Sequence, residues 1–384
     1  MKILLIGEYS GVHTNLKKIL LNNGHSVYLI HDGDSYKKFD SNDFSIKYNR
    51  IISKNKIINT FFSIFYLILD LIGLKGLLQS LKYLGEIREL KDFDIVQIIN
   101  TKPFSQFGTW ANYLLLKQVF KNNKKVYLCV LGDDFTWVKS CLEKKPPYSM
   151  FDNFKLKNIK DFIYSLTYVY GFGAKLIDQY VLKNVEEVIP GLYDYYFAYN
   201  AMGRNCSEVI PIAYEGTYKK NKEIKYPIRI FHGWQIGKEL RKGNVIFDNA
   251  IKKLIKKYPD FIEYNVVQNV VYDEYIKLFD NSDIVVDQCY SLDKGVNALI
   301  GMSNGKVVFS GCDKLTKEYY SNGIENCLIN AEPNEDKIFQ QLEALILNKE
   351  RIIQIQENAR AYMENYHSYN YVYRQYCKIW KIPQ

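Results

Sequence analysis

Two neighbouring cations precede a predicted helix in the second half of the chain. Arg241 and Lys242 are followed by Gly243 and then by Asn244, a good N-cap for the amphipathic pattern that begins there. A helix start offers unpaired N–H groups and the positive end of the helix dipole, and cations beside it favour a diphosphate. The pattern therefore predicts a diphosphate site at these two cations. The alternative is a pair of solvated loop side chains.

A second stretch that suits phosphate chemistry runs from Asp283 to Gly305. Its pattern predicts a strand, a loop, a helix that begins at Gly295 and Val296, a glycine turn and another strand. The loop would lie at the carboxyl end of a parallel strand, where open α/β sheets bind ligands. The helix start at Gly295 and Val296 is therefore predicted to add its N–H groups and its dipole to the same diphosphate site.

The elements around these stretches predict an α/β protein. The chain opens with a strand from Lys2, a helix that ends at Asn23 with Gly24 in a left-handed cap, and a strand from His25 to Ile30, which together form a doubly wound βαβ unit. Later apolar runs are typical of strands that are covered on both faces. These runs are 94–99, 125–131, 187–189, 209–210, 228–231 and 262–267.

A change in composition divides the chain. Residues 215–223 are polar and charged, and the α/β pattern restarts at Ile228. The predicted fold is two Rossmann-like domains that face a cleft, 1–214 and 215–366, with a helix at 367–384 that packs back on the first domain. The same outline serves several functions, so the fold alone does not give the activity.

The sequence resembles the bacterial group 1 (family four) glycosyltransferases of capsule, O-antigen or exopolysaccharide assembly, which have the GT-B fold. The resemblance covers most of the chain. It is most specific at 241–243 and 283–305, where that family has a small-residue helix end followed by a Gly-Lys/Thr turn and a Val-Val strand. The weaker matches lie at 7–13, 31–34, 131–134, 189–193 and 210–212.

The resemblance implies transfer of a sugar from a nucleotide-diphosphate donor to a glycan or lipid-linked acceptor in cell-surface polysaccharide synthesis. It also implies retention of configuration, no metal or other cofactor, and no nucleic-acid partner. The residues that it places near the sugar and nucleotide of the donor are Gly233, Asp287, Asn297 and Ile300. The alternatives are a sugar-nucleotide 2-epimerase of the same fold and a catalytically silent partner that binds a nucleotide sugar.

The chain departs from the family at its pair of glutamates. The two positions fall on Leu292 and Ile300, and an isoleucine cannot accept a hydrogen bond from a ribose hydroxyl. Asp293, next to Leu292, is predicted to replace the earlier carboxylate as a catalytic residue. Asn297 is predicted to supply a polar contact one turn before Ile300. Weak or lost catalysis is the alternative.

Further candidates lie in the first domain. Gly132, Asp133 and Asp134 follow a predicted strand and are expected to face the cleft, with Asp133 catalytic and the other two on the acceptor side together with Gly11. His13, at the start of the first helix, is a further predicted catalytic residue. The alternatives are a helix-capping turn for the aspartates and a structural role for the histidine. A metal site is not predicted, because adjacent residues point in different directions.

Composition limits the location of the protein. The chain has 384 residues, a net charge of +9 and seven cysteines without a Cys-x-x-Cys pair, which predicts a reducing cytoplasm and no zinc site. The apolar run from Ile57 to Leu84 is interrupted by Asp70 and is too short to span a membrane. It is predicted to be helical, and either to pack in the core or to contact the anionic cytoplasmic leaflet.

Overall fold

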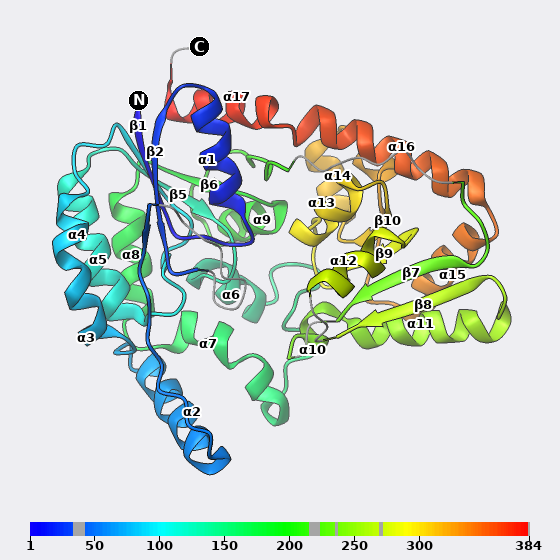
Figure 1. The fold of residues 1–384 in the computed structure, drawn as a ribbon, viewed down its shortest axis with the longest axis horizontal. Coiled ribbons are helices and arrows are strands. Elements are labelled where there is room, and N and C mark those ends of the chain that lie inside the picture. The colour runs from blue at the N-terminus through cyan, green and yellow to red at the C-terminus, as the bar shows by residue number, and fades with distance from the viewer. Residues whose placement is uncertain (34–42, 215–222, 235–236, 269–271, 383–384) are drawn as a thin grey trace.

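The computed structural model describes residues 1–33, 43–214, 223–234, 237–268 and 272–382. These residues form two α/β domains that lie side by side, each built on one parallel sheet with helices on both faces (Figure 1). The predicted fold class, two Rossmann-like domains with a helical C-terminal region, is confirmed. The linker predicted at 215–223 lies almost wholly outside the described residues.

The first domain is built on a six-stranded sheet in the order β3-β2-β1-β4-β5-β6. Its strands are β1 (Lys2–Ile6), β2 (Ser26–His31), β3 (Phe44–Ser45), β4 (Ile95–Ile98), β5 (Val126–Val130) and β6 (Glu187–Pro190). Its helices are α1 (Val12–Asn22), α2 (Lys56–Leu71), α3 (Leu77–Ser80), α4 (Leu84–Glu89), α5 (Thr109–Asn122), α6 (Phe135–Leu142), α7 (Ile163–Tyr170), α8 (Ala174–Asn184) and α9 (Tyr193–Ala201), with 3-10 turns η2 (Leu81–Tyr83) and η3 (Leu156–Asp161).

The second domain is built on a five-stranded sheet in the order β11-β10-β9-β7-β8. Its strands are β7 (Ile228–Gly233), β8 (Ile262–Val267), β9 (Ile284–Val286), β10 (Val307–Ser310) and β11 (Ile329–Asn330). Its helices are α10 (Glu239–Lys242), α11 (Asn244–Lys257), α12 (Tyr272–Asp280), α13 (Val296–Ser303), α14 (Lys314–Tyr320), α15 (Glu335–Ile346) and α16 (Lys349–Tyr366), with the 3-10 turn η4 (Ile324–Asn326).

The strand order reverses once in each sheet, between β1 and β4 and between β7 and β9. At such a switch point the helices that follow two neighbouring strands leave on opposite faces, which opens a space at the carboxyl ends of the strands. After β7 the chain carries Lys242 at the end of α10, and Asp287 follows β9 directly; the loops after β1 and β4 carry Gly11 and Lys102. The topology therefore collects polar side chains at these edges.

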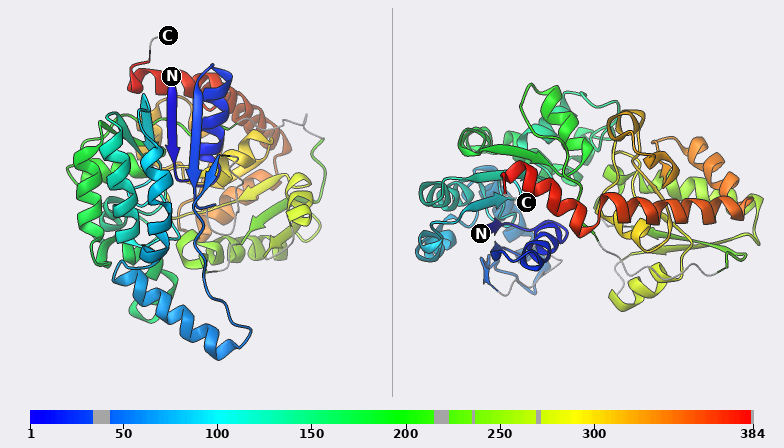
Figure 2. Two further views of the ribbon diagram at one scale, coloured as in Figure 1. Left: turned by 60° about the vertical axis from the view of Figure 1, so that its left-hand side comes forward. Right: turned by 90° about the horizontal axis from the view of Figure 1, so that it is seen from above.

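The C-terminal helices join the two domains. Helix α16 leaves the second domain, and α17 (Tyr369–Trp380) lies across the first domain beside α1 (Figures 1 and 2). Buried Val372, Tyr376 and Trp380 of α17 pack in one cluster with Ile3 and Leu5 of β1. Removal of this apolar area from water fixes the last helix on the domain in which the chain began.

Two local predictions differ from the structure. Residues 209–210 form no strand: Ile210 N donates to the Pro190 carbonyl oxygen at 3.0 Å, but Pro211 follows and has no N–H to continue the ladder. Asn244 is the first residue of α11 and not its cap; the cap position is Gly243, with φ of 75°, a left-handed value that suits glycine.

Helix α2 projects from the first domain as a separate rod (Figure 2). It has 16 residues and none is buried, although the helix is rich in Ile, Leu and Phe. Of the two alternatives for this segment, packing in the core does not hold for α2. Among the described residues, the structure contains no helix that is both long and apolar enough to cross a bilayer.

Candidate functional site

A polar cluster lies at the carboxyl edge of the second sheet. Lys242 Nζ donates to Asp287 Oδ1 at 2.8 Å, and Asn297 Nδ2 donates to the same oxygen at 3.3 Å. Ser310 Oγ donates to Asp287 Oδ2 at 3.2 Å. Asp287 is 4% exposed, so this carboxylate is the buried hub that holds the lysine and the amide in place. Three of the residues predicted for the donor side are thus brought together.

Helix α13 begins beside this cluster. Its N-cap, Gly295, is extended and no side chain caps the first turn. A Cβ atom at Gly295 would lie 3.7 Å from Asp287 Oδ2 and 3.2 Å from the Gln288 amide nitrogen, so the helix start approaches the cluster closely. Uncapped N–H groups and the helix dipole give this point a positive character that suits an anion.

Arg241 and Lys242 do not share a target. Both stand at the end of the short helix α10, and not in a loop as predicted. Arg241 turns toward the first domain, where its Nη2 donates to Asp133 Oδ2 at 3.0 Å and to Oδ1 at 3.2 Å. Ser165 Oγ donates to the same carboxylate. The structure therefore joins Asp133 of the first domain to Arg241 of the second, directly beside the Lys242 cluster.

Gly132 and Asp134 are the chain neighbours of Asp133. Asp134 is 1% exposed and caps α6 by accepting from Trp137 N at 2.7 Å, and it also accepts from Tyr199 Oη at 2.8 Å. Burial raises the pKa of Asp134 to about 7. The side chain faces the interior, so the prediction that Asp134 contacts the acceptor is wrong and the capping alternative holds. Gly132 N donates to the Tyr195 hydroxyl oxygen at 2.8 Å.

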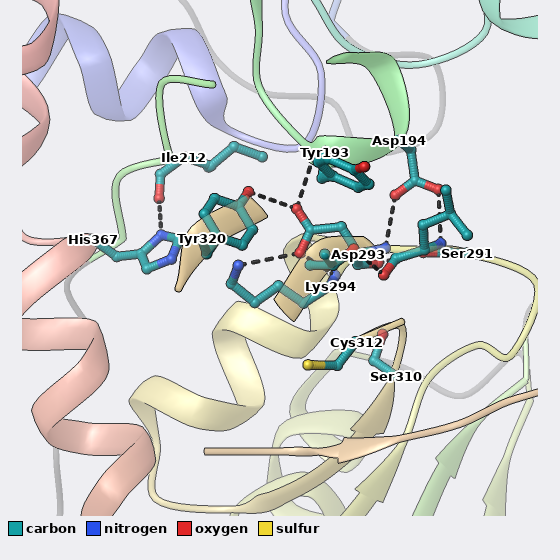
Figure 3. Close-up of polar contacts among 12 residues, drawn as sticks. Tyr193, Asp194, Ile212, Ser291, Asp293, Lys294, Ser310, Cys312, Tyr320 and His367 are labelled. Atoms are coloured by element: carbon teal, nitrogen blue, oxygen red, sulfur yellow. Dashed lines mark hydrogen bonds and ion pairs between the residues drawn. The ribbon is translucent and has the colours of Figure 1, made fainter. Parts of the chain in front are cut away.

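Asp293 lies in a buried seam between the domains (Figure 3). Its Oδ2 accepts from Tyr193 N at 2.9 Å and from Tyr320 Oη at 2.8 Å, and its Oδ1 accepts from Lys294 Nζ at 3.2 Å. Both Asp293 and Lys294 are at most 1% exposed. Both carboxylate oxygens of Asp293 therefore accept hydrogen bonds from protein groups, and the side chain is buried. This arrangement indicates a structural role and not a contact with a sugar. The predicted catalytic placement is not supported.

Hydrogen bonds cross this seam in both directions. Asp194, in the first turn of α9, accepts from the backbone N–H groups of Leu292 and Asp293, both at 2.9 Å. Burial and then the neighbouring Asp293 charge raise the pKa of Asp194 to about 7. Each domain thus presents one aspartate to the main chain of the other (Figure 3). His367 lies close by, where Nδ1 contacts the Ile212 carbonyl oxygen at 2.7 Å.

His13 is fully buried in the first domain. Its Nδ1 lies 2.8 Å from the Gly7 carbonyl oxygen and its Nε2 lies 3.1 Å from Gln97 Nε2. Burial lowers its pKa to about 3, so the ring is neutral. A ring without exposed surface cannot reach a substrate in this structure, and the structural alternative is favoured. Gly11, with φ of 82°, starts α1 in the left-handed conformation that glycine tolerates.

Gly233 and Ile300, the other residues predicted near the sugar and nucleotide, are not part of the hydrogen-bonded cluster around Asp287. Gly233 ends β7, and a Cβ atom there would lie 3.5 Å from Tyr275 Oη. Ile300 is half-buried on α13 and packs on the apolar cluster that includes Leu299 and Met302. The side chain offers no polar group, as the sequence indicated. Among the described residues, no group of three or more His, Cys, Asp or Glu side chains is arranged to hold a metal ion.

Sequence reasoning missed Lys102, which follows β4. Its Nζ lies 3.7 Å from the centre of the Tyr168 ring, and burial lowers its pKa to about 8. Asn100 ties its loop to the next one, because Asn100 Oδ1 accepts from Lys102 N and Asn100 Nδ2 donates to the carbonyl oxygens of Leu131 and Asp133. The sequence did offer a signal for this site, because three polar residues, 100–102, directly follow an apolar strand.

No protein-family model and no curated protein matches this sequence. Solved structures do match it. A glycosyltransferase from Rickettsia africae has 16% identity and a TM-score of 0.54, with 99% of this chain and 97% of that chain covered. A sucrose-phosphate synthase from Thermosynechococcus elongatus has 10% identity and a TM-score of 0.59, with 99% and 98% covered. HepE from Anabaena, in complex with UDP and glucose, has 12% identity and a TM-score of 0.54, with 99% of each chain covered. At these identities the likeness shows the fold, which is GT-B.

Proposed function

We propose that the protein is a glycosyltransferase that takes a sugar from a nucleoside-diphosphate donor. The observation that carries the proposal is the cluster of Lys242, Asp287 and Asn297 at the switch point of the second sheet, beside the uncapped start of α13. A structure of the same fold, HepE, was solved with UDP and glucose. The weak but full-length likeness to that structure agrees with the ligand class that the cluster suits.

In this proposal the second domain stabilises the leaving diphosphate. Negative charge grows on the diphosphate as the bond to the sugar breaks, and fixed positive groups that face it lower the transition-state energy. Lys242 supplies a full charge and α13 supplies N–H groups. Asp287 positions Lys242 and Asn297 and is fixed by Ser310, so the cation is already oriented before the donor binds.

The first domain supplies the acceptor side. Asp133 is a carboxylate at the point where the domains meet, and it would accept a hydrogen bond from the acceptor hydroxyl once Arg241 turns toward the diphosphate. Retention of configuration, the absence of a metal requirement, and a role in cell-surface polysaccharide synthesis are proposed from the family resemblance. We leave His13, Asp134 and Asp293 out of the chemistry because their side chains are buried in structural contacts.

A panel of nucleotide sugars tests the proposal. The protein is incubated with UDP-, GDP- and ADP-linked sugars and with glycan or lipid-linked acceptors, and products are identified by mass spectrometry. Transfer to an acceptor is expected. Conversion of the free nucleotide sugar to its epimer would support the epimerase alternative, and binding without either reaction would support the silent binding partner.

We also propose that helix α2 binds an anionic membrane that carries the acceptor. Ile57, Phe61, Ile64, Phe65 and Ile68 lie at helical spacing and are all exposed, Ile57 by 81% and Phe61 by 67%. The exposed cations nearby are Arg50, Lys54 and Lys56, and Asp70 is already paired with Lys75. Apolar area flanked by cations is the pattern of an interfacial helix.

Replacing Phe61 and Phe65 together with aspartate is expected to abolish flotation of the protein with anionic liposomes. The melting temperature should stay unchanged, because neither ring is buried. Leu347→Asp, at an exposed position of the second domain, is the matched control and should float like the parent protein. Equal flotation of the parent with neutral and anionic vesicles, or loss of flotation in the control, would refute the membrane role of α2.

A further inference from the structure

Lys102 is a buried cation without a counter-ion. It is 5% exposed, and its ammonium makes no hydrogen bond or ion pair with any residue in the described part of the chain; its contact is the face of Tyr168 at 3.7 Å. Burial of an ammonium group without an acceptor is unfavourable. A buried lysine of this kind, whose loop is tied by Asn100 to Asp133 of the proposed active site, is therefore a candidate for binding an anion.

The nearby carboxylates already have their own partners. Asp133 is bonded to Arg241 and Ser165, and Asp70 is paired with Lys75 at 3.3 Å. These groups act on Lys102 from a distance, since the charges of Asp70, Lys75 and Asp133 all perturb its pKa, after the larger effect of burial. Two cations therefore accompany the two carboxylates, and Lys102 is the additional positive charge.

Lys102 also has an informative position along the molecule. The charges of Asp70, in the last turn of the exposed apolar helix α2, and of Lys75, just beyond that helix, both act on Lys102. Asn100 ties the Lys102 loop to Asp133, because its Oδ1 accepts from Lys102 N and its Nδ2 donates to the Asp133 carbonyl oxygen. Asp133 in turn joins the first domain to Arg241, next to Lys242 of the donor cluster.

We propose that Lys102 binds a phosphate group of the acceptor, so that the acceptor is a phosphorylated compound whose reacting hydroxyl reaches Asp133. The assignment of this anion to an acceptor rests on the proposed glycosyltransferase function; the anion site itself does not. A phosphate would supply the acceptor atoms that the ammonium lacks, and an apolar tail on the same molecule would extend toward α2. The phosphate could belong to a lipid or to a soluble sugar phosphate.

Binding is measured with farnesyl phosphate and with farnesol, which lacks the phosphate, by calorimetry in the presence of saturating UDP. UDP occupies the donor site, and its own affinity reports separately on the proposed function. The variants are Lys102→Met, which keeps an apolar stem against Tyr168, and Lys102→Gln, a second neutral variant in case the first does not fold. Lys91→Met is the matched control, because the Lys91 side chain is 59% exposed.

The parent protein and Lys91→Met are expected to bind farnesyl phosphate at least ~10-fold more tightly than farnesol, and the neutral variants should lose this preference. UDP affinity should be the same in all of them. Binding of glucose 1-phosphate that depends equally on Lys102 would identify a soluble source of the phosphate. A preference that survives in both neutral variants, or no preference in the parent protein, would overturn the proposal. Failure of UDP to bind would count against the glycosyltransferase function alone, and farnesyl phosphate is then tested without it.

Discussion

Replacing Lys242 with alanine is expected to weaken UDP binding by ~10- to 100-fold. A hydrogen bond between a charged donor and a phosphate contributes roughly 1.5–3 kcal/mol, and each 1.4 kcal/mol is a factor of ten in affinity. The variant also removes the only cation that pairs with Asp287 among the described residues, so the Asp287 carboxylate, whose side chain is 3% exposed, would repel the diphosphate. Both effects act in the same direction, so we expect this to be the largest single loss of donor affinity.

The control for this experiment is Lys252→Ala on α11, where the lysine pairs with Asp248 at the surface and its side chain is 63% exposed. Its UDP affinity should match the parent protein. Adding Asp287→Asn to the Lys242→Ala variant removes the unpaired charge and should recover part of the loss. Calorimetry that gives the same dissociation constant for Lys242→Ala and the parent protein would exclude Lys242 from the donor site.

Replacing Asp293 with alanine is expected to lower the free energy of unfolding by ~3–5 kcal/mol, because one partner of a buried ion pair is removed. Lys294 would keep its charge at 1% side-chain exposure, and Tyr193 N and Tyr320 Oη would lose their acceptor. Denaturant unfolding measures the change. Lys294→Met in the same chain should restore much of the stability, since it removes the unpaired charge.

The same pair of variants separates the structural role of Asp293 from the catalytic role predicted from the sequence. A structural role predicts that the double variant, once refolded and stable, keeps its UDP affinity and transferase activity. A variant that is as stable as the parent protein but has lost turnover would restore Asp293 to the chemistry. The result would also show whether the seam of Asp194 and Asp293 is needed to hold the two domains together.

The sequence was informative about the fold because its signals are local. Continuous apolar strands such as Val126–Val130, the Gly24 cap and the composition change near Ile228 each reflect short-range physics. The failures have the same origin. Residues 209–210 have strand-like side chains. Pro190, at the end of the neighbouring strand β6, and Pro211 have no N–H group to continue the ladder. The apolar run at α2 left core packing and membrane contact both open, and the structure leaves the helix exposed.

The sequence grouped the site residues correctly only where they follow the ends of neighbouring strands. Lys242, Asp287, Asn297 and Gly295 follow strands that are neighbours in the sheet, so strand-end reasoning brought them together. The pairing of Asp133 with Arg241 joins residues of different domains, and nothing in their spacing indicates it. Burial is equally invisible in a single sequence, which is why the sequence left both a catalytic and a structural role open for His13 and did not indicate Lys102.

A crystal structure with UDP-glucose bound would show directly whether the Lys242 cluster is the donor site. We expect the diphosphate to lie within hydrogen-bond distance of Lys242 Nζ and of the first N–H groups of α13, with the glucose directed toward Asp133. A diphosphate bound away from Lys242 and α13, or a crystal that takes up no nucleotide under conditions in which the protein is folded, would contradict it.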